Sequence, residues 1–200
     1  MTAQHDFDEI FGRVPLMAIL RGMGVDRSVR LAGTAWDLGI DSVEVPLQTE
    51  EDERALRELV RLGAERGKLV GAGTIVSPDQ ITLAQAAGAA YLVSPGLDPI
   101  VVRAAQDAGI PILPGVATPT EVQLAQSLGL TWLKAFPATW LGVDWFRHMK
   151  GPFPHVRFVA TGGIDASNAQ EFLDAGVRVV AVGSALEDAS QLDRLAALLS

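Results

Sequence analysis

The sequence contains no cysteine and only three lysines, three histidines and one tyrosine. Without cysteine the chain forms no disulfide bond, carries no thiolate nucleophile and offers no cysteine ligands to a zinc or iron–sulfur site. It also lacks any apolar run near the ~20 residues that span a membrane. Its N-terminus has no basic segment followed by an apolar one, so we expect no secretory signal. These absences together predict a cytoplasmic protein.

Positive charge is scarce as well, because the chain has 16 Lys+Arg against 24 Asp+Glu, which gives a formal net charge of −8. Such an acidic chain is a poor match for nucleic acid or an anionic membrane, so neither is expected as a partner. Apolar residues make up 48% of the 200 residues and charged residues 20%, which excludes a disordered chain. We expect a single folded domain over residues 1–200 with a sizeable core.

A weak internal repeat organises the chain. A small residue or leucine, then glycine, then an apolar residue recurs, as in Leu38-Gly39-Ile40 and Ala108-Gly109-Ile110. Each such glycine predicts the end of a helix, where a residue with positive φ is favoured. Three of the apolar runs that follow lead to a polar residue before proline, which predicts the start of the next helix. These pairs are Ser77-Pro78, Asp98-Pro99 and Thr118-Pro119.

Apolar, β-branched runs between the helical segments are predicted as eight strands. They are Leu16–Leu20, Ser42–Leu47, Leu69–Thr74, Tyr91–Ser94, Pro111–Val116, Trp132–Phe136, Arg157–Thr161 and Val179–Gly183. Strands that alternate with single helices favour a parallel sheet built from right-handed βαβ units. Eight such units favour an α/β fold of the compact (β/α)8 TIM-barrel type, with residues 1–13 as an extra N-terminal helix. The alternative is an open doubly wound sheet, although no GxGxxG follows the first strand.

Two charged residues lie inside otherwise apolar strands, namely Lys134 in Trp132–Phe136 and Glu44 in Ser42–Leu47. The alternation of side chains along a strand turns both toward the barrel interior. Burial lowers the pKa of a lysine and frees its amine as a nucleophile for Schiff-base formation. A nearby carboxyl group then serves as general acid/base. The alternative interpretation is an inert buried ion pair.

Glycines follow the last two predicted strands, at the positions where such barrels commonly bind phosphate through backbone N–H groups. Gly162 and Gly163 come after the seventh strand, and Gly183 and Ser184 stand at the end of the eighth. Glycine lets the backbone approach an anion closely. These residues are candidate phosphate ligands, with ordinary turn glycines as the alternative.

Further polar residues lie at other strand ends. Arg21 directly follows the first strand and can hold a carboxylate by a two-pronged contact. Thr74 ends the third strand and is either a hydroxyl donor to the substrate or a turn residue. A metal site is not expected, because His5, His148 and His155 fall outside the strand ends and a single inward acid chelates a divalent ion poorly.

Taken together, short segments in order along the chain carry a family resemblance. They are Ala18–Gly22 (AILRG), Val43–Leu47 (VEVPL), Gly71–Thr74 (GAGT), Ser94–Leu97 (SPGL), Pro114-Gly115, Lys134–Ala138 (KAFPA), Thr161–Ile164 (TGGI) and Gly183-Ser184. The chain resembles the short class I aldolases that act on 2-keto-3-deoxy-6-phosphogluconate (KDPG) and related 2-keto acids. The resemblance implies a homotrimer that uses neither a metal nor an organic cofactor and that takes a small 2-keto acid as substrate.

The resemblance also implies roles for the matching residues. Lys134 is implied as the Schiff-base lysine and Glu44 as the acid/base that transfers protons. The implied substrate contacts are Arg21, Thr74, Pro95 and Thr161, and the implied phosphate contacts are Gly162, Gly163, Gly183 and Ser184. The implied reaction cleaves a KDPG-type sugar acid to pyruvate and glyceraldehyde 3-phosphate.

Two positions depart from the family pattern. Gln48 stands where gluconate-type members usually carry arginine, and Thr139 stands where a glutamate often follows FPA, with no role assigned to it. The galactonate analogue of KDPG or 4-hydroxy-2-oxoglutarate is therefore an alternative main substrate. Outside this chemistry, the alternatives are a phosphosugar isomerase or epimerase on the same barrel, and a sugar-phosphate-binding barrel without activity.

Overall fold

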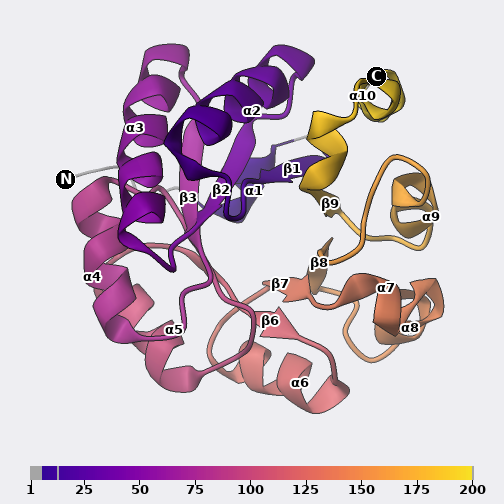
Figure 1. Ribbon diagram of the computed structural model, residues 1–200. Helices are drawn as coiled ribbons and strands as arrows, with labels where there is room; N and C mark the ends of the chain where they lie inside the picture. Colours follow the sequence, from indigo (N-terminus) through magenta and orange to yellow (C-terminus); the bar gives the residue numbers. More distant parts are fainter. Residues whose placement is uncertain (1–5, 13, 200) are drawn as a thin grey trace.

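The computed structural model describes residues 6–12 and 14–199. Within that part of the chain, nine strands form one parallel sheet in the order β5-β4-β3-β2-β1-β9-β8-β7-β6, and the helices surround them (Figure 1). The strands are β1 (Leu16–Ile19), β2 (Ser42–Pro46), β3 (Leu69–Gly73), β4 (Leu92–Val93), β5 (Ile112–Leu113), β6 (Gly115–Val116), β7 (Trp132–Ala135), β8 (Arg157–Ala160) and β9 (Val179–Val182). The prediction of a (β/α)8 barrel is confirmed.

The stretch predicted as the fifth strand, Pro111–Val116, forms two short strands instead of one. β5 pairs with β4, whereas β6 pairs with β7, so this one stretch joins both edges of the sheet. Pro114 separates the two strands and has no N–H to donate to a neighbour. Its carbonyl accepts a hydrogen bond of 2.9 Å from the Lys134 N–H. The backbone changes pairing partner at Pro114, and the barrel closes there.

Several helices begin at residues that favour a helix start. Thr49 and Thr118 form capping boxes, and proline occupies the first turn of α4, α5 and α6. The helices are α1 (Phe7–Phe11), α2 (Gly24–Leu38), α3 (Glu50–Arg66), α4 (Pro78–Ala87), α5 (Pro99–Asp107), α6 (Pro119–Ser127), α7 (Ala138–Leu141), α8 (Val143–Met149), α9 (Ala169–Asp174), the 3-10 helix η1 (Ser184–Glu187) and α10 (Ala189–Ala197).

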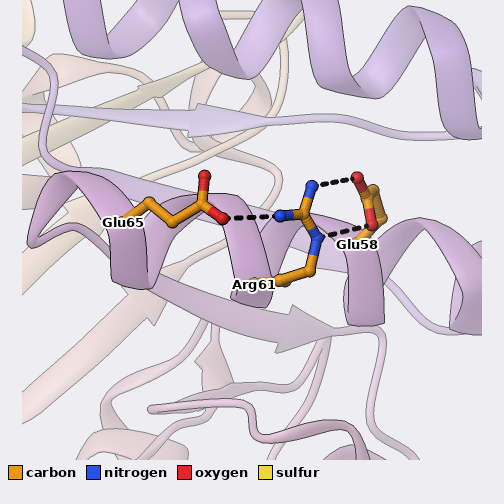
Figure 2. A network of polar contacts seen from close by, with 3 residues as sticks. All are labelled: Glu58, Arg61 and Glu65. Atoms are coloured by element: carbon orange, nitrogen blue, oxygen red, sulfur yellow. Dashed lines mark hydrogen bonds and ion pairs between the residues drawn. The ribbon is translucent and has the colours of Figure 1, made fainter.

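The outer faces of the helices are solvated and carry paired charges. Figure 2 shows Arg61 on α3 between Glu58 and Glu65, at N–O distances of 2.7 and 2.6 Å. Such exposed pairs contribute little to stability because water screens them. This network belongs to the solvated outer face of α3.

Helix α1 closes the N-terminal end of the barrel. Its Phe11 ring lies 5.1 Å from the Trp132 ring, and its Phe7 ring lies 6.0 Å from the Tyr91 ring. The helix expected over residues 1–13 is observed over Phe7–Phe11, while residues 1–5 and 13 lie outside the described residues. Aromatic side chains thus fill the interior at this end of the barrel.

Candidate active site

A cavity of about 410 Å³ opens at the carboxyl ends of β1, β7, β8 and β9. It is lined by many of the residues singled out from the sequence, which are Arg21, Lys134, Thr161, Gly162, Gly163, Gly183 and Ser184. The fold thus brings together residues that are up to 163 positions apart in the sequence, from Arg21 to Ser184. Glu44, Thr74 and Pro95 do not line this cavity.

Lys134 extends from β7 into this cavity, as the strand alternation predicted. The residue is only 2% exposed, and its Nζ lies 5.1 Å from the centre of the Phe136 ring. Its amine makes no hydrogen bond or ion pair with any residue that the structure describes. Burial lowers the pKa of Lys134, and the nearby charge of Arg21 lowers it further, while Glu44 opposes the shift. The amine is therefore more readily neutral, and hence nucleophilic, than that of an exposed lysine.

Glu44 faces inward from β2 and is fully buried, with no exposed surface. Neither carboxylate oxygen has a hydrogen-bond partner among the described residues. Burial raises the pKa of Glu44 against the opposing charges of Lys134 and Arg21. A carboxyl group whose pKa is raised gives and takes protons at higher pH than an exposed one, which suits a general acid/base.

Glycines in β3 leave space for the side chains of Glu44 and Tyr91. A Cβ on Gly73 would lie 1.8 Å from Glu44 Oε1, and a Cβ on Gly71 would lie 2.2 Å from the Tyr91 ring. The Tyr91 hydroxyl donates a 2.8 Å hydrogen bond to the carbonyl of Val43, the residue before Glu44. Tyr91 therefore supports the strand that carries Glu44. The sequence interpretation did not include this role, although Tyr91 is the single tyrosine of the chain.

Thr74 ends β3 in an unusual conformation. Its φ of 57° is positive, which is true of no other non-glycine residue in the described ranges. The Gln80 side chain donates to the carbonyls of Thr74 and Leu47 at 3.2 and 2.8 Å, so it ties together the loops after β3 and β2. Strained backbone of this kind persists only where its surroundings hold it, commonly at functional sites.

The loop after β8 presents unpaired donors to the cavity. Gly162 and Gly163 have φ values of 98° and 77°, the left-handed region that favours glycine. The backbone N–H groups of Gly162, Gly163, Ile164 and Ser184 donate to no described residue, and the buried Thr161 hydroxyl has no partner among these residues. Free donors on residues that line one cavity suit an anionic or hydroxylated ligand.

Asp165 and Asn168 belong to the same loop but were not predicted. Asp165 lines the cavity, and hydrogen bonds from the hydroxyl and N–H of Ser167 lower the pKa of its carboxyl group. The Asn168 side chain donates to the Gly163 carbonyl at 3.0 Å. The one available sign in the sequence was a cluster of short polar residues, Asp165–Asn168, and clusters of that type are common in loops.

Comparison with known proteins decides which family carries this arrangement. The model of the KDPG and KHG aldolase family matches residues 7–197. The chain belongs to this family. It is an aldolase, a lyase, and the isomerase or epimerase interpretation is thereby excluded.

Relatives of this aldolase span most of its length. It is 33% identical over 180 residues to the 2-dehydro-3-deoxy-6-phosphogalactonate aldolase of Escherichia coli, covering 90% of this chain and 87% of that enzyme. It is 37% identical over 176 residues to the 2-dehydro-3-deoxy-phosphogluconate aldolase of Treponema pallidum, covering 88% and 82%. The crystal structure of the Legionella pneumophila KDPG aldolase, in which pyruvate was captured at low pH as a covalent carbinolamine, matches with a TM-score of 0.87 at 29% identity, covering 98% of this chain and all of that one.

The described part of the aldolase holds neither a metal-binding cluster nor a membrane-spanning helix. Among its described residues, no three or more acidic, histidine or cysteine side chains gather in a way that would hold a metal ion. Within the same residues, no helix has both the length and the apolar character needed to cross a bilayer.

Proposed function

We propose that this aldolase cleaves KDPG-type sugar acids to pyruvate and glyceraldehyde 3-phosphate through a Schiff base on Lys134. The observation that carries the proposal is the buried, unpaired amine of Lys134 in the cavity. The other two lysines do not compete, because Lys68 forms an ion pair with Asp41 and Lys150 lies exposed on the surface. The covalent pyruvate adduct described for the Legionella pneumophila relative supports the same chemistry here.

The proposed reaction begins when the Lys134 amine adds to the C2 ketone of the substrate and water leaves. The protonated imine then accepts the electron pair of the C3–C4 bond as that bond breaks. Glu44 takes the proton of the C4 hydroxyl, directly or through a water molecule, and the aldehyde departs. The enamine that remains is protonated at C3 and hydrolysed, which releases pyruvate and restores the amine.

The remaining site residues are proposed to bind the substrate. Arg21 and Thr74 hold the pyruvate end, with Pro95 nearby, and the free hydroxyl of Thr161 binds a substrate hydroxyl. The phosphate lies against the backbone of the residues after β8 and β9, which are Gly162, Gly163, Gly183 and Ser184. The enzyme works as a single (β/α)8 domain in each subunit of a cytoplasmic homotrimer, without metal or organic cofactor.

Gln48 favours a second candidate substrate. It is exposed beyond the end of β2, where gluconate-type relatives are expected to carry arginine, and an amide cannot form a charged clamp. The galactonate epimer and 4-hydroxy-2-oxoglutarate therefore remain candidates. A pyruvate-release assay with both phosphorylated C4 epimers and with 4-hydroxy-2-oxoglutarate, run side by side, identifies the preferred one.

Trapping of the imine tests the chemistry itself. The protein is incubated with pyruvate, reduced with borohydride and digested, and the adduct is located by mass spectrometry. We expect the adduct on Lys134, no adduct in Lys134→Met, and a fall in turnover of at least about 10⁴-fold in that variant, within the range for loss of a covalent nucleophile. An adduct on Lys68 or Lys150, or none at all, would overturn the Schiff-base proposal.

A further inference from the structure

Thr139 contacts both glycines of the loop after β8. Its backbone N–H and its hydroxyl both donate to the Gly162 carbonyl, at 3.3 and 3.2 Å. Its side chain also packs on Gly163, where an added Cβ would lie 2.5 Å from Thr139 Oγ1 and 2.8 Å from Cγ2. Thr139 is exposed and does not line the cavity, so it touches the loop from outside.

These contacts fix the direction of the next N–H group. In a trans peptide the carbonyl and the N–H point in opposite directions. Because Thr139 holds the Gly162 carbonyl on the outer side, the Gly163 N–H of the same peptide is turned away from Thr139. That N–H donates to no described residue, and Gly163 lines the cavity.

Asn168 acts in the same way on the following peptide. Its Nδ2 donates to the Gly163 carbonyl at 3.0 Å, and its Oδ1 accepts from the Asp165 N–H at 3.0 Å. The Ile164 N–H, which belongs to the peptide that carries the Gly163 carbonyl, is likewise free of any described partner. Two neighbouring peptides are therefore held from outside with their N–H groups unpaired.

Thr139 also links this loop to the strand of the proposed nucleophile. It lies five residues beyond Lys134, and the N–H of the intervening Ala138 donates to the Thr161 carbonyl at 2.7 Å. The segment from Lys134 to Thr139 thus sets the position of the loop relative to the amine. A change at Thr139 should therefore alter the binding of a ligand that contacts both the loop and the Lys134 amine. It should not alter the binding of a ligand that contacts the amine alone.

We propose that Thr139 is a positioning residue that sets the preference of this aldolase for phosphorylated over unphosphorylated 2-keto acids, because it orients the Gly163 N–H, one of the groups proposed to receive the terminal phosphate. The inference rests on the proposed function, in which Gly162 and Gly163 bind that phosphate. It assigns a role to a residue that does not itself touch the substrate.

The test compares Thr139→Val, which keeps the shape but loses the hydroxyl, with Thr139→Ser, which retains it. Thr34→Val is the matched control, because the Thr34 hydroxyl also donates to a carbonyl at 3.2 Å, that of Arg30 within α2. The readouts are KM and kcat for the phosphorylated epimer that the wild type prefers and for 4-hydroxy-2-oxoglutarate, the dissociation constant of inorganic phosphate, and borohydride trapping with pyruvate.

In Thr139→Val we expect KM for the phosphorylated substrate and the phosphate dissociation constant to rise about three- to tenfold, the scale of one net hydrogen bond. The kcat for both substrates and the KM for 4-hydroxy-2-oxoglutarate should change less than about twofold, below that same scale. Trapping should be unaltered, and Thr139→Ser and Thr34→Val should behave as wild type.

Equal losses for both substrates, or no change in phosphate binding, would overturn the role of Thr139. So would a wild-type protein that does not bind inorganic phosphate. Failure of the wild type to trap pyruvate overturns the proposed function instead. In that case the phosphate measurement, which needs no turnover, still decides whether Thr139 orients an anion site.

Discussion

The two ends of the barrel differ in the side chains that fill them: aromatic rings at the N-terminal end and polar groups at the C-terminal end. At the N-terminal end, the rings of Phe7 and Phe11 pack on Trp132, and Phe7 also contacts Tyr91. Arg157 lies over the Trp132 ring at 5.4 Å and pairs with Asp8. At the C-terminal end, buried polar groups on β2, β7 and after β8 have no partner within the described residues, and the backbone adopts positive φ after β3 and β8. The Trp132 indole N–H at the first end, and the Glu44 carboxylate and the Thr161 hydroxyl at the second, are the buried side-chain groups near the two ends that have no partner among the described residues.

The difference shows which end stabilises the fold and which is available for chemistry. Aromatic pairs contribute about 0.5–1.5 kcal/mol each beyond the burial of their area. A buried polar group without a partner costs about 1–3 kcal/mol. Groups that have no partner within the protein can bind a substrate that supplies one. Substitutions at the two ends should therefore separate stability from activity.

The largest effect is expected at the closed end. Phe11→Ala removes a ring that is 2% exposed, and it should lower the free energy of unfolding by about 3–5 kcal/mol, as for other buried aromatic truncations. The KM of the folded variant should equal that of the wild type, because Phe11 lies at the end of the barrel opposite the cavity. Urea unfolding and steady-state kinetics measure the two quantities. A raised KM with unchanged stability would break the distinction between the ends.

At the C-terminal end, Glu44→Gln should lower activity and leave the fold intact, the reverse of what is expected for Phe11→Ala. It should lower turnover by about 10²-fold or more, the scale of lost acid/base assistance, while pyruvate can still be trapped on Lys134. Gln is nearly isosteric with Glu, so packing is preserved. Unchanged turnover would show that another group carries the proton. Loss of trapping would show that Glu44 acts before the imine forms.

The same substitution should raise stability at neutral and alkaline pH. The pKa of Glu44 is raised in the folded protein above its ordinary value of 4.5, so between the two values the folded state holds more protons than the unfolded state. Stability from this group is present below pH 4.5 and is lost as pH rises through the folded pKa. The introduced glutamine side chain does not titrate, so the melting temperature of the variant should exceed that of wild type at pH 8 and match it near pH 4. A lower melting temperature at pH 8 would contradict the raised pKa.

Local patterns were enough to predict the barrel and the direction of its two inward charges. Alternation along a strand depends on neighbouring residues only, so Lys134 and Glu44 could be oriented before any tertiary contact was known. Helix ends were equally local, as with the pair Thr118-Pro119, which predicted the helix start observed at α6.

Features that depend on which segments meet were not predictable in this way. The change of pairing partner at Pro114 follows from barrel closure, and the burial of Glu44 against Gly73 follows from the pairing of β2 with β3. Thr139 received no role from the sequence because its partner, Gly162, lies 23 residues further along the chain. A polar residue in a loop gives no sign of such a contact until the loops after two strands are brought side by side.

The smallest effect is expected from alanine at a single glycine, Gly163, compared with alanine at Gly129. Gly163 and Gly129 have nearly the same φ, 77° and 80°, so alanine at either should cost about 1–2 kcal/mol of backbone strain. A Cβ at Gly129 meets nothing within 4 Å, whereas at Gly163 it would meet Thr139 Oγ1. Gly163→Ala should therefore shift the loop and lower kcat/KM for the phosphorylated substrate by about tenfold, while Gly129→Ala should lose stability alone. Combining Gly163→Ala with Thr139→Ala removes the two shortest contacts and leaves the Thr139 Cβ at 3.2 Å. The double variant should therefore lose less stability than the sum of the two single losses. Equal kinetic losses in the two glycine variants would mean that strain, and not the contact with Thr139, governs the loop.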